Sequence, residues 1–337
     1  MKTASFLEPT SLAPISLATV FSLAFCLLSS VAAAQAIREI QLPAELSYPE
    51  GIGYDAASGH IYTASALDGI VVRTNLRSGA SEIIAKPGVI LPDDNKVFPG
   101  ALGMKVDRAK RLWLTGGRTG KIHVLDTRDG SLIKTIATPG EGGVLNDTVV
   151  TQDYVYVTDT FRPTLWRVPV NGSQIGEAEA WIDLKGSPID YSQQGPKLNG
   201  VTLTPDGKDL IVVHMGNGKL FKIGIATRAI TPIDIGTDTV QGGDGLALDG
   251  TLLYVVRQPA AEVVTVKLAS DLSSGKIVSR LTDPAIKWPA TAVKVGDELL
   301  VVNAQFNKRA TNDPVRPFSV TAIPVSRLGG NEAALRK

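Results

Sequence analysis

The chain has 337 residues, with 34 Lys and Arg against 33 Asp and Glu, and therefore a formal net charge of +1. This near-neutral balance lacks the strong basic excess, with a pI above ~9, that marks nucleic-acid binding. The residues are 44% hydrophobic and 20% charged, which excludes a disordered or fibrous protein, and the single cysteine, Cys26, cannot form an intrachain disulfide.

The first part of the chain, Pro9–Ile37, is uncharged and ends in small residues. An apolar run of this kind indicates a secretory signal peptide, which we place at residues 1–34, with cleavage near Ala34 or Ala36. The alternative is an uncleaved anchor, because the segment is nearly long enough to span a membrane. Cleavage would give a secreted protein with no stable membrane insertion, and it would remove Cys26 and with it any thiol chemistry.

Residues 35–337 repeat one pattern six times, namely a short apolar stretch opened by a small polar motif, a turn, and an alternating strand. Successive units begin 44 to 53 residues apart, at Glu50, Leu102, Asn146, Asn199, Asp244 and Thr291. A period of this length is typical of a four-stranded propeller blade. The second strand of each unit is rich in Val, Ile, Leu and Tyr, as a buried strand should be. The sequence therefore predicts an all-β protein, a single six-bladed β-propeller with four-stranded blades.

The first residues of the six units should form a ring, because the innermost strand of every blade lines the central channel. Four of the six are carboxylates or amides flanked by apolar residues, where polar groups are costly unless satisfied. Ca²⁺ takes such carboxylate and carbonyl oxygens, whereas Mg²⁺ needs a tighter octahedron, and the absence of His and Cys disfavours zinc and copper. We predict a divalent metal, in the first place Ca²⁺, with the ligands Glu50, Asn146, Asn199 and Asp244.

A purely conformational interpretation stays open for part of this ring, because Asn-Gly and Asp-Gly pairs are also turn signals. Four other glycine-containing motifs fit hairpin turns between strands and are given no function: Asp68-Gly69, Asp129-Gly130, Asp206-Gly207 and Gly116-Gly117-Arg118.

Taken in order, four motifs make the chain resemble the senescence-marker-protein and gluconolactonase family of the calcium-dependent phosphotriesterase superfamily. The motifs are Pro49-Glu50-Gly51, Leu145-Asn146-Asp147, Leu198-Asn199-Gly200-Val201 and Gly243-Asp244-Gly245-Leu246. The resemblance implies one catalytic divalent metal, usually calcium, held at the channel by Glu50, Asn146, Asn199 and Asp244. It further implies that Asn146 contacts the substrate beside the metal and that Asp244 acts as base or nucleophile.

Two positions depart from the patterns of this superfamily. Gluconolactonase-like members carry an Arg two residues before the Asn-Asp motif, and this chain has Val144 there. The difference weakens the case for a sugar-acid lactone and indicates a less polar small-molecule substrate. Paraoxonase-like members have an acidic residue for a second calcium where this chain has Gly51, so we expect no second ion.

Other side chains compete with Asp244 for the role of general base. Asp147 is adjacent to a predicted ligand, although holding the backbone of its turn is the simpler role. His214 closes an apolar strand at the end where active-site loops should gather, and a histidine titrates near neutral pH. Strand alternation accounts for the two remaining histidines, His60 and His123.

Three long gaps between predicted strands should carry residues of the pocket mouth, because long loops in compact domains are often functional. They span residues 86–99, 186–197 and 306–317. A glycosylation sequon, Asn171-Gly172-Ser173, lies on an expected exposed turn and predicts a glycoprotein if the host is eukaryotic. The second sequon begins at Asn146 and should stay unmodified, since a glycan is incompatible with a channel ligand.

The leading hypothesis from the sequence is a secreted, calcium-dependent hydrolase of lactones or related esters, in which the channel metal polarises the carbonyl. A second hypothesis is a non-hydrolytic secondary-metabolite enzyme, a cyclase or isomerase, on the same scaffold. A third is a non-enzymatic propeller that uses the metal for rigidity and binds a partner.

Overall fold

The structure is a computed structural model that describes Met1, residues 36–92 and residues 97–329. The predicted signal peptide lies outside the described residues apart from Met1. Within the described part, no helix is both long and apolar enough to cross a membrane.

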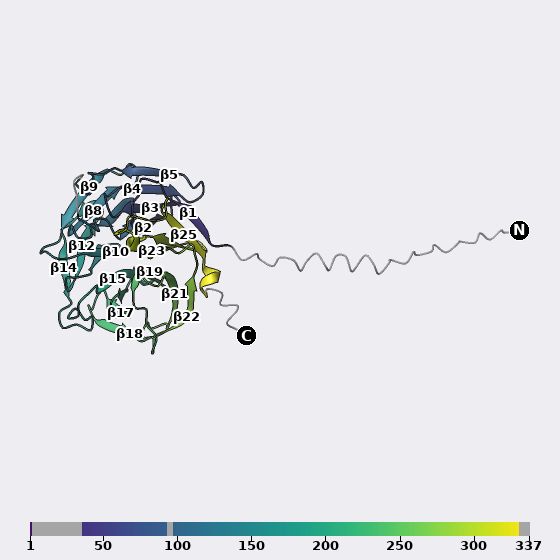
Figure 1. Ribbon diagram of the computed structural model, residues 1–337. Coiled ribbons are helices and arrows are strands. Elements are labelled where there is room, and N and C mark those ends of the chain that lie inside the picture. The colour runs from purple at the N-terminus through teal and green to yellow at the C-terminus, as the bar shows by residue number, and fades with distance from the viewer. Residues whose placement is uncertain (2–35, 93–96, 330–337) are drawn as a thin grey trace. The chain divides into compact units, whose positions relative to one another are not determined.

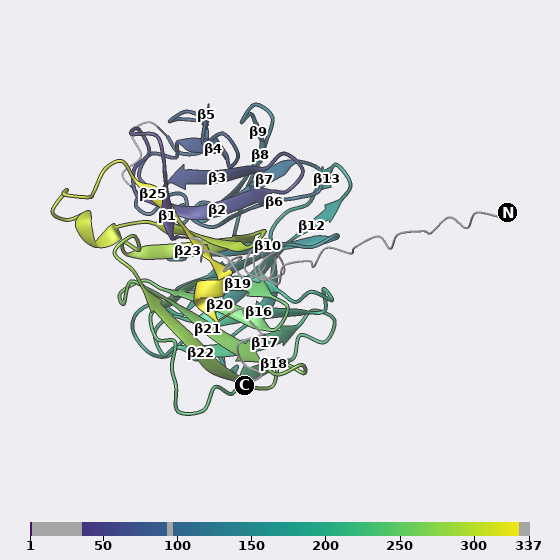
Figure 2. The same ribbon diagram turned by 90° about the vertical axis from the view of Figure 1, so that its right-hand side faces the viewer.

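Residues 36–92 and 97–329 form a six-bladed β-propeller of antiparallel sheets, as predicted, with the inner strands at the centre of Figure 1. In Figure 2, the strands of the first blade follow one another from the middle of the domain to its edge. The inner strands are β2 (Pro49–Asp55), β6 (Met104–Val106), β10 (Leu145–Val150), β15 (Leu198–Leu203), β19 (Gly243–Asp249) and β23 (Pro289–Val295). Their pairing partners are β3 (His60–Ser65), β7 (Arg111–Thr115), β11 (Tyr154–Asp159), β16 (Asp209–His214), β20 (Leu252–Arg257) and β24 (Glu298–Asn303).

The third and fourth strands complete each blade toward the rim. The third strands are β4 (Val71–Asn75), β8 (Lys121–Asp126), β12 (Thr164–Asn171), β17 (Lys219–Gly224), β21 (Glu262–Leu268) and β25 (Ser319–Pro324). The fourth are β5 (Ser81–Ala85), β9 (Leu132–Ala137), β14 (Glu179–Asp183), β18 (Ile230–Ile233), β22 (Gly275–Thr282) and β1 (Arg38–Gln41). A two-residue strand, β13 (Gln174–Ile175), extends the third blade. Two short 3-10 turns, η1 (Phe306–Lys308) and η2 (Val325–Leu328), lie in the last blade.

The hydrophobic core consists of clusters that each join neighbouring blades. Ile52 of β2 and Val72 of β4, for example, pack with Leu300 of β24 and Val320 of β25. All four side chains are fully buried, and each contributes about 1.5–3 kcal/mol relative to an exposed side chain. Alternating strands of this kind present one face to each neighbouring blade, so the packing follows from the periodicity of the sequence.

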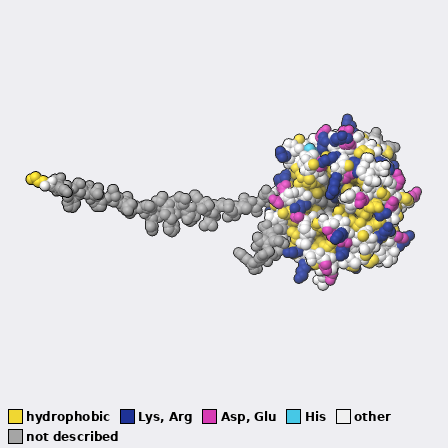
Figure 3. All heavy atoms as spheres, turned by 180° about the vertical axis from the view of Figure 1, so that it is seen from behind, with side chains coloured by type: hydrophobic (Ala, Val, Ile, Leu, Met, Phe, Trp, Pro, Cys, Tyr) yellow, Lys and Arg dark blue, Asp and Glu magenta, His cyan; other side chains and the backbone are white. Residues whose placement is uncertain are grey.

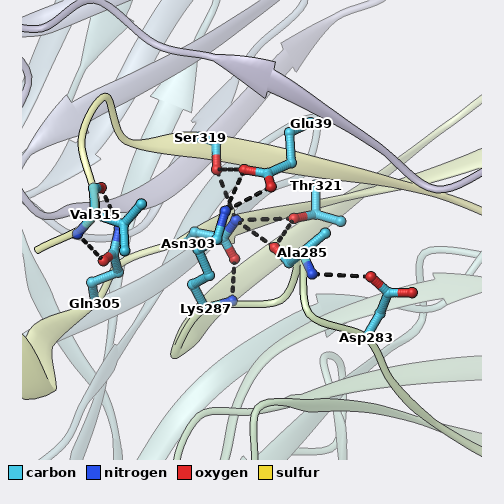
Figure 4. Close-up of polar contacts among 9 residues, drawn as sticks. All are labelled: Glu39, Asp283, Ala285, Lys287, Asn303, Gln305, Val315, Ser319 and Thr321. Atoms are coloured by element: carbon cyan, nitrogen blue, oxygen red, sulfur yellow. Dashed lines mark hydrogen bonds and ion pairs between the residues drawn. The ribbon is translucent and has the colours of Figure 1, made fainter.

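The propeller closes through a strand that the repeat pattern did not reveal. β1, near the start of the chain, pairs with β25 in the register Arg38↔Ala322 to Gln41↔Ser319 and is the fourth strand of the last blade. Figure 4 shows the polar contacts behind this closure. Both carboxylate oxygens of Glu39 accept hydrogen bonds from Lys287 Nζ at 2.6 Å, and Ser319 Oγ donates to Glu39 Oε2 at 2.7 Å.

A buried asparagine connects this closure to the neighbouring strands. Asn303 is fully buried, and its Nδ2 lies 2.9 Å from Ala285 O, 3.0 Å from Ser319 Oγ and 2.9 Å from Thr321 Oγ1. Its Oδ1 accepts a hydrogen bond from the backbone N–H of Lys287 at 2.8 Å. The same side chain thereby positions Lys287, the partner of Glu39, and Ser319 of the strand on which β1 pairs.

We expect Glu39→Gln to lower the free energy of unfolding at pH 7 by about 1 kcal/mol, because it removes a charge-assisted contact. Burial raises the pKa of Glu39, but hydrogen bonds from Lys287 and Ser319 outweigh it, so the pKa is lowered from 4.5. A carboxyl group whose pKa is lower in the folded than in the unfolded protein stabilises the fold at pH values above its unfolded-state pKa. This stabilisation is lost as the pH falls through its folded-state pKa. Denaturant unfolding should therefore separate the variant from the parent at pH 7, and the difference should shrink as the pH is lowered toward 3.

The matched control is Glu45→Gln, at an exposed position outside the strands, which should unfold like the parent at both pH values. Equal stability of Glu39→Gln and the parent at pH 7 would contradict a closing role for this carboxylate.

Candidate functional site

The predicted ring residues stand at β-bulges, where an inner strand carries an extra residue and a side chain is re-aimed. The pairing of five inner strands with their neighbours shifts register at the ring position. The shifts lie between Pro49 and Ile52, Leu145 and Thr148, Leu198 and Val201, Gly243 and Leu246, and Pro289 and Ala292.

The glycine that follows a ring residue is required by close approach between neighbouring inner strands. A Cβ at Gly51 would lie 2.1 Å from Leu102 O, and one at Gly200 would lie 2.3 Å from Asp244 O. Gly200 and Gly245 lie inside strands β15 and β19, so the turn interpretation of Asn199-Gly200 and Asp244-Gly245 is wrong. The three Asp-Gly pairs predicted as hairpin turns do have glycines with positive φ: Gly69 (77°), Gly130 (73°) and Gly207 (71°).

The structure brings all four predicted ligands to one cavity of about 150 Å³. Their exposed fractions are low: 4% for Glu50, 7% for Asn146, 4% for Asn199 and 3% for Asp244. The ring is therefore a buried polar cluster at the channel.

Three oxygens of this ring are buried without any hydrogen-bond partner among the described residues: Glu50 Oε2, Asn146 Oδ1 and Asn199 Oδ1. Asn146 Nδ2 donates to Thr160 Oγ1 at 3.1 Å, which leaves its Oδ1 facing the ring. Asn199 Nδ2 contacts Met215 Sδ at 3.3 Å, and the Asn199 side chain also hydrogen-bonds the carboxylate of Asp244, which partly offsets the rise in the pKa of Asp244 caused by burial. An unsatisfied buried acceptor costs about 1–3 kcal/mol. A hard cation would satisfy all three oxygens, so the donor set fits a divalent metal.

The electrostatics of the ring support the same interpretation. Burial raises the pKa of Glu50 well above its usual value, and the charges of Asp244 and Asp147 raise it further, while Lys105 opposes them. Burial, followed by the charge of Asp147, likewise raises the pKa of Asp244. A cation between the two carboxylates would offset this repulsion. No three His, Cys, Asp or Glu side chains gather as a metal site in the described residues. Two of the four ligands predicted for this ring are amides, which such a grouping does not count.

Asp147 holds backbone groups in place, as one of its two predicted roles required, although it lies in strand β10 and not in a turn. It is buried, and its Oδ1 accepts the backbone N–H of Thr148 at 2.8 Å while its Oδ2 accepts that of Val201 at 3.1 Å. The second bond connects β10 to β15 of the next blade. Lys105 Nζ lies 3.5 Å from Asp147 Oδ1. Asp147 thus fixes the positions of the strands that carry Asn146 and Asn199.

His214 is not among the residues that line the cavity. The backbone N–H of Asn217 donates to His214 Nδ1 at 3.2 Å, so Nε2 carries the proton and donates to Asp190 O at 2.8 Å. With both ring nitrogens engaged in holding loops, His214 has no free nitrogen to act as a base. His123 is buried in β8, where burial lowers its pKa to about 4, and His60 opens β3. Both lie in strands, as expected.

The cavity wall is mostly apolar. Val144 lines it, at the position where the resembled family has an Arg, and it packs with Leu102 and Ala66. Each of the three long gaps contributes one wall residue: Pro99, Pro196 and Phe306. The gaps therefore do reach the mouth, as the sequence analysis expected.

Other wall residues, all missed from the sequence, come from turns between second and third strands: Arg118, Thr160, Phe161, Met215 and Gln258. Arg118 had been assigned only to a hairpin turn. The order of the strands could have revealed these residues. The second strand of each blade runs antiparallel to the inner strand, so the turn that follows it lies at the same end of the blade as the ring.

A larger cavity, of about 910 Å³, lies at the opposite ends of the inner strands and contains none of the ring residues. Turns after β6, β10 and β15 surround it, with Arg111, Tyr154 and Pro205 among its lining. No buried unpartnered polar atom of the described residues lies in its lining, whereas the smaller cavity has three. On the face seen in Figure 3, Lys and Arg side chains are interspersed with Asp and Glu, as the near-zero net charge predicts.

The fold and the ring define a six-bladed β-propeller with a polar cluster at its channel. The sequence matches no protein-family model and no curated protein. A gluconolactonase from Xanthomonas campestris is similar in structure, with 15% identity, a TM-score of 0.60, and coverage of 86% of this chain and 89% of that one. The major allergen Mala s 1 of Malassezia sympodialis has 14% identity, a TM-score of 0.64, and coverage of 87% and 97%.

A streptogramin B lyase is also similar, with 14% identity, a TM-score of 0.57, and coverage of 80% of each chain. Enzymes with different reactions and an allergen thus share this architecture. At such identities the likeness shows the fold alone.

If the ring binds a divalent cation, CaCl₂ should raise the Tm of the protein, and Glu50→Gln should abolish most of that rise. Binding at a hundredfold excess over Kd stabilises by about 2.7 kcal/mol, roughly 5 °C for a domain of this size. Without metal, Glu50→Gln should be no less stable than the parent. The substitution removes a buried carboxylate whose charge is repelled by those of Asp244 and Asp147. Differential scanning calorimetry with EDTA or CaCl₂ measures both effects, and an equal Ca²⁺ response in the variant would contradict the site.

Proposed function

We propose that this protein is a secreted hydrolase of lactones or related esters that uses a divalent cation, in the first place Ca²⁺, at its channel. The observation that carries the proposal is the set of three buried, unpartnered oxygens on Glu50, Asn146 and Asn199 beside the carboxylate of Asp244. A cavity with such a donor set at its floor and apolar walls is suited to a small organic substrate. The structural likeness to a gluconolactonase is consistent with this chemistry.

When bound, a Ca²⁺ ion would supply Lewis-acid polarisation of an ester or lactone carbonyl. Glu50, Asn146, Asn199 and Asp244 would hold the ion. The Nδ2 of Asn146 is held by Thr160 Oγ1, so its Oδ1 keeps one orientation beside the substrate. We assign the proton of the attacking water to a carboxylate oxygen of Asp244, since neither ring nitrogen of His214 is free.

The wall residues exclude water from the reacting groups. Val144, Leu102 and Phe306 cover one side of the cavity with apolar surface. This surface matches the expectation of a substrate less polar than a sugar-acid lactone. It also lowers the local dielectric, which strengthens every charge interaction at the cavity floor.

We expect hydrolysis of some members of a panel of lactones and aryl esters, with activity lost in EDTA and restored by Ca²⁺. Asp244→Asn should lower kcat by about a hundredfold or more, because a general base typically contributes 10²–10⁴ in rate. The matched control is Asp249→Asn in the same strand, where the carboxylate instead pairs with Lys294 at 2.9 Å. No turnover of any panel member by the Ca²⁺-loaded parent would overturn the hydrolase proposal.

A second candidate, a lyase, isomerase or cyclase on the same scaffold, is favoured by the apolar Val144 wall and the likeness to a streptogramin B lyase. Reaction in ¹⁸O-labelled water distinguishes it from a hydrolase. A hydrolase places one labelled oxygen in the carboxyl group of its acid product, whereas elimination or isomerisation takes up no label from the water. A third candidate, a metal-stabilised binding propeller, predicts that Asp244→Asn changes only stability or partner binding.

A further inference from the structure

Among the residues that the structure describes, one positive charge lines the cavity, that of Arg118. Arg118 is exposed in the β7–β8 turn and belongs to the cavity lining. Among the described residues no carboxylate pairs with it, and its guanidinium carbon lies 5.8 Å from the ring centroid of Phe161. Phe161 is itself 39% exposed. The two side chains therefore form a cation–π pair at the mouth, with donor N–H groups still available.

The backbone places Arg118 in a defined position. Gly117 has φ 54°, and a Cβ there would lie 2.2 Å from Pro99 O, so only glycine fits. The backbone N–H of Arg118 donates to Pro99 O at 3.0 Å, and Gly117 O accepts the N–H of Leu145 at 3.0 Å. Leu145 immediately precedes the ring residue Asn146. The turn that carries Arg118 is thus anchored beside the candidate metal ligands.

The remaining lining of the cavity is mostly apolar. Apolar surface comes from Leu102, Val144, Met215 and Phe306. Besides Arg118, the turns at the mouth contribute two polar residues, Thr160 and Gln258. Among its described residues, the cavity therefore combines the carboxylates of Glu50 and Asp244, an apolar wall, and the guanidinium of Arg118. A ligand that complements it has a reactive carbonyl at one end, an apolar body, and a negative charge at the other.

We propose that Arg118 binds a carboxylate of the substrate, so that the substrate class is apolar lactones or esters that carry a second, ionised carboxyl group. The substrate class rests on the proposed function, whereas carboxylate binding at Arg118 does not. A guanidinium fork matches the two oxygens of a carboxylate. A single cation balances a single negative charge, and a dianionic phosphate would keep an uncompensated charge facing Glu50 and Asp244.

The test uses two aromatic lactones that differ only in bearing a carboxylate or its methyl amide away from the ring carbonyl. The Ca²⁺-loaded parent should favour the carboxylate in kcat/KM by about tenfold, the effect of one charge-assisted hydrogen bond. Arg118→Gln should abolish this preference, and Arg118→Lys should retain part of it. Arg77→Gln, at an exposed position outside the cavity lining, should keep the parental ratio. Raising KCl should reduce the preference, because the site is exposed to solvent.

The corresponding lactams, which resist hydrolysis, keep this test independent of turnover. Titration calorimetry should show tighter binding of the carboxylate lactam than of its amide partner in the parent and equal binding in Arg118→Gln. If no lactone is hydrolysed but the lactams follow this pattern, the hydrolase proposal fails and the role of Arg118 stands. If the carboxylate has no advantage in the parent, or if Arg118→Gln keeps that advantage, the role of Arg118 is overturned.

Discussion

The close approach of neighbouring inner strands at the channel is the constraint on which the rest of the structure depends. At Gly51, Gly200 and Gly245 even a methyl group would overlap the next strand. The approach is possible because the bulges lie at the same positions. The same geometry turns one side chain of each bulge toward the channel. The polar ring is thus a consequence of how tightly the blades pack.

This packing concentrates charge that the protein neutralises only in part. Glu50, Asp147 and Asp244 are all buried, and Lys105 is the cation that opposes their charge. Asp147 has backbone donors to satisfy it, while Glu50 leaves one oxygen unpartnered. Such an arrangement lowers the stability of a metal-free protein, and it persists naturally where an ion supplies the missing charge. The uncompensated charge of the ring is therefore the feature on which the proposed metal site rests.

The sequence was sufficient to predict the blades and the ring, because both follow from periodicity. The alternating strands repeat at a regular spacing, and this spacing alone assigns equivalent strand positions to Glu50, Asn146, Asn199 and Asp244. It was not sufficient for features that depend on contacts between distant segments. β1 has only four residues and carries no repeat motif, so its pairing with β25 was missed. Hydrogen bonding at both nitrogens of His214 is likewise a property of loops packed from other parts of the chain.

The strands and the turns of this propeller differ in how strongly the fold constrains them. The strands place the ring, and every blade repeats their geometry, so a shared fold at 14–15% identity fixes no substrate. The mouth comes from turns such as those of Arg118, Phe161 and Gln258, which can change without disturbing the ring. Under the proposed function, a residue in a turn at the ring end of a blade would affect substrate choice, whereas the ring would affect the reaction. The guanidinium of Arg118, which pairs with no carboxylate among the described residues, lies in one of these turns, and its proposed contribution is therefore to selectivity.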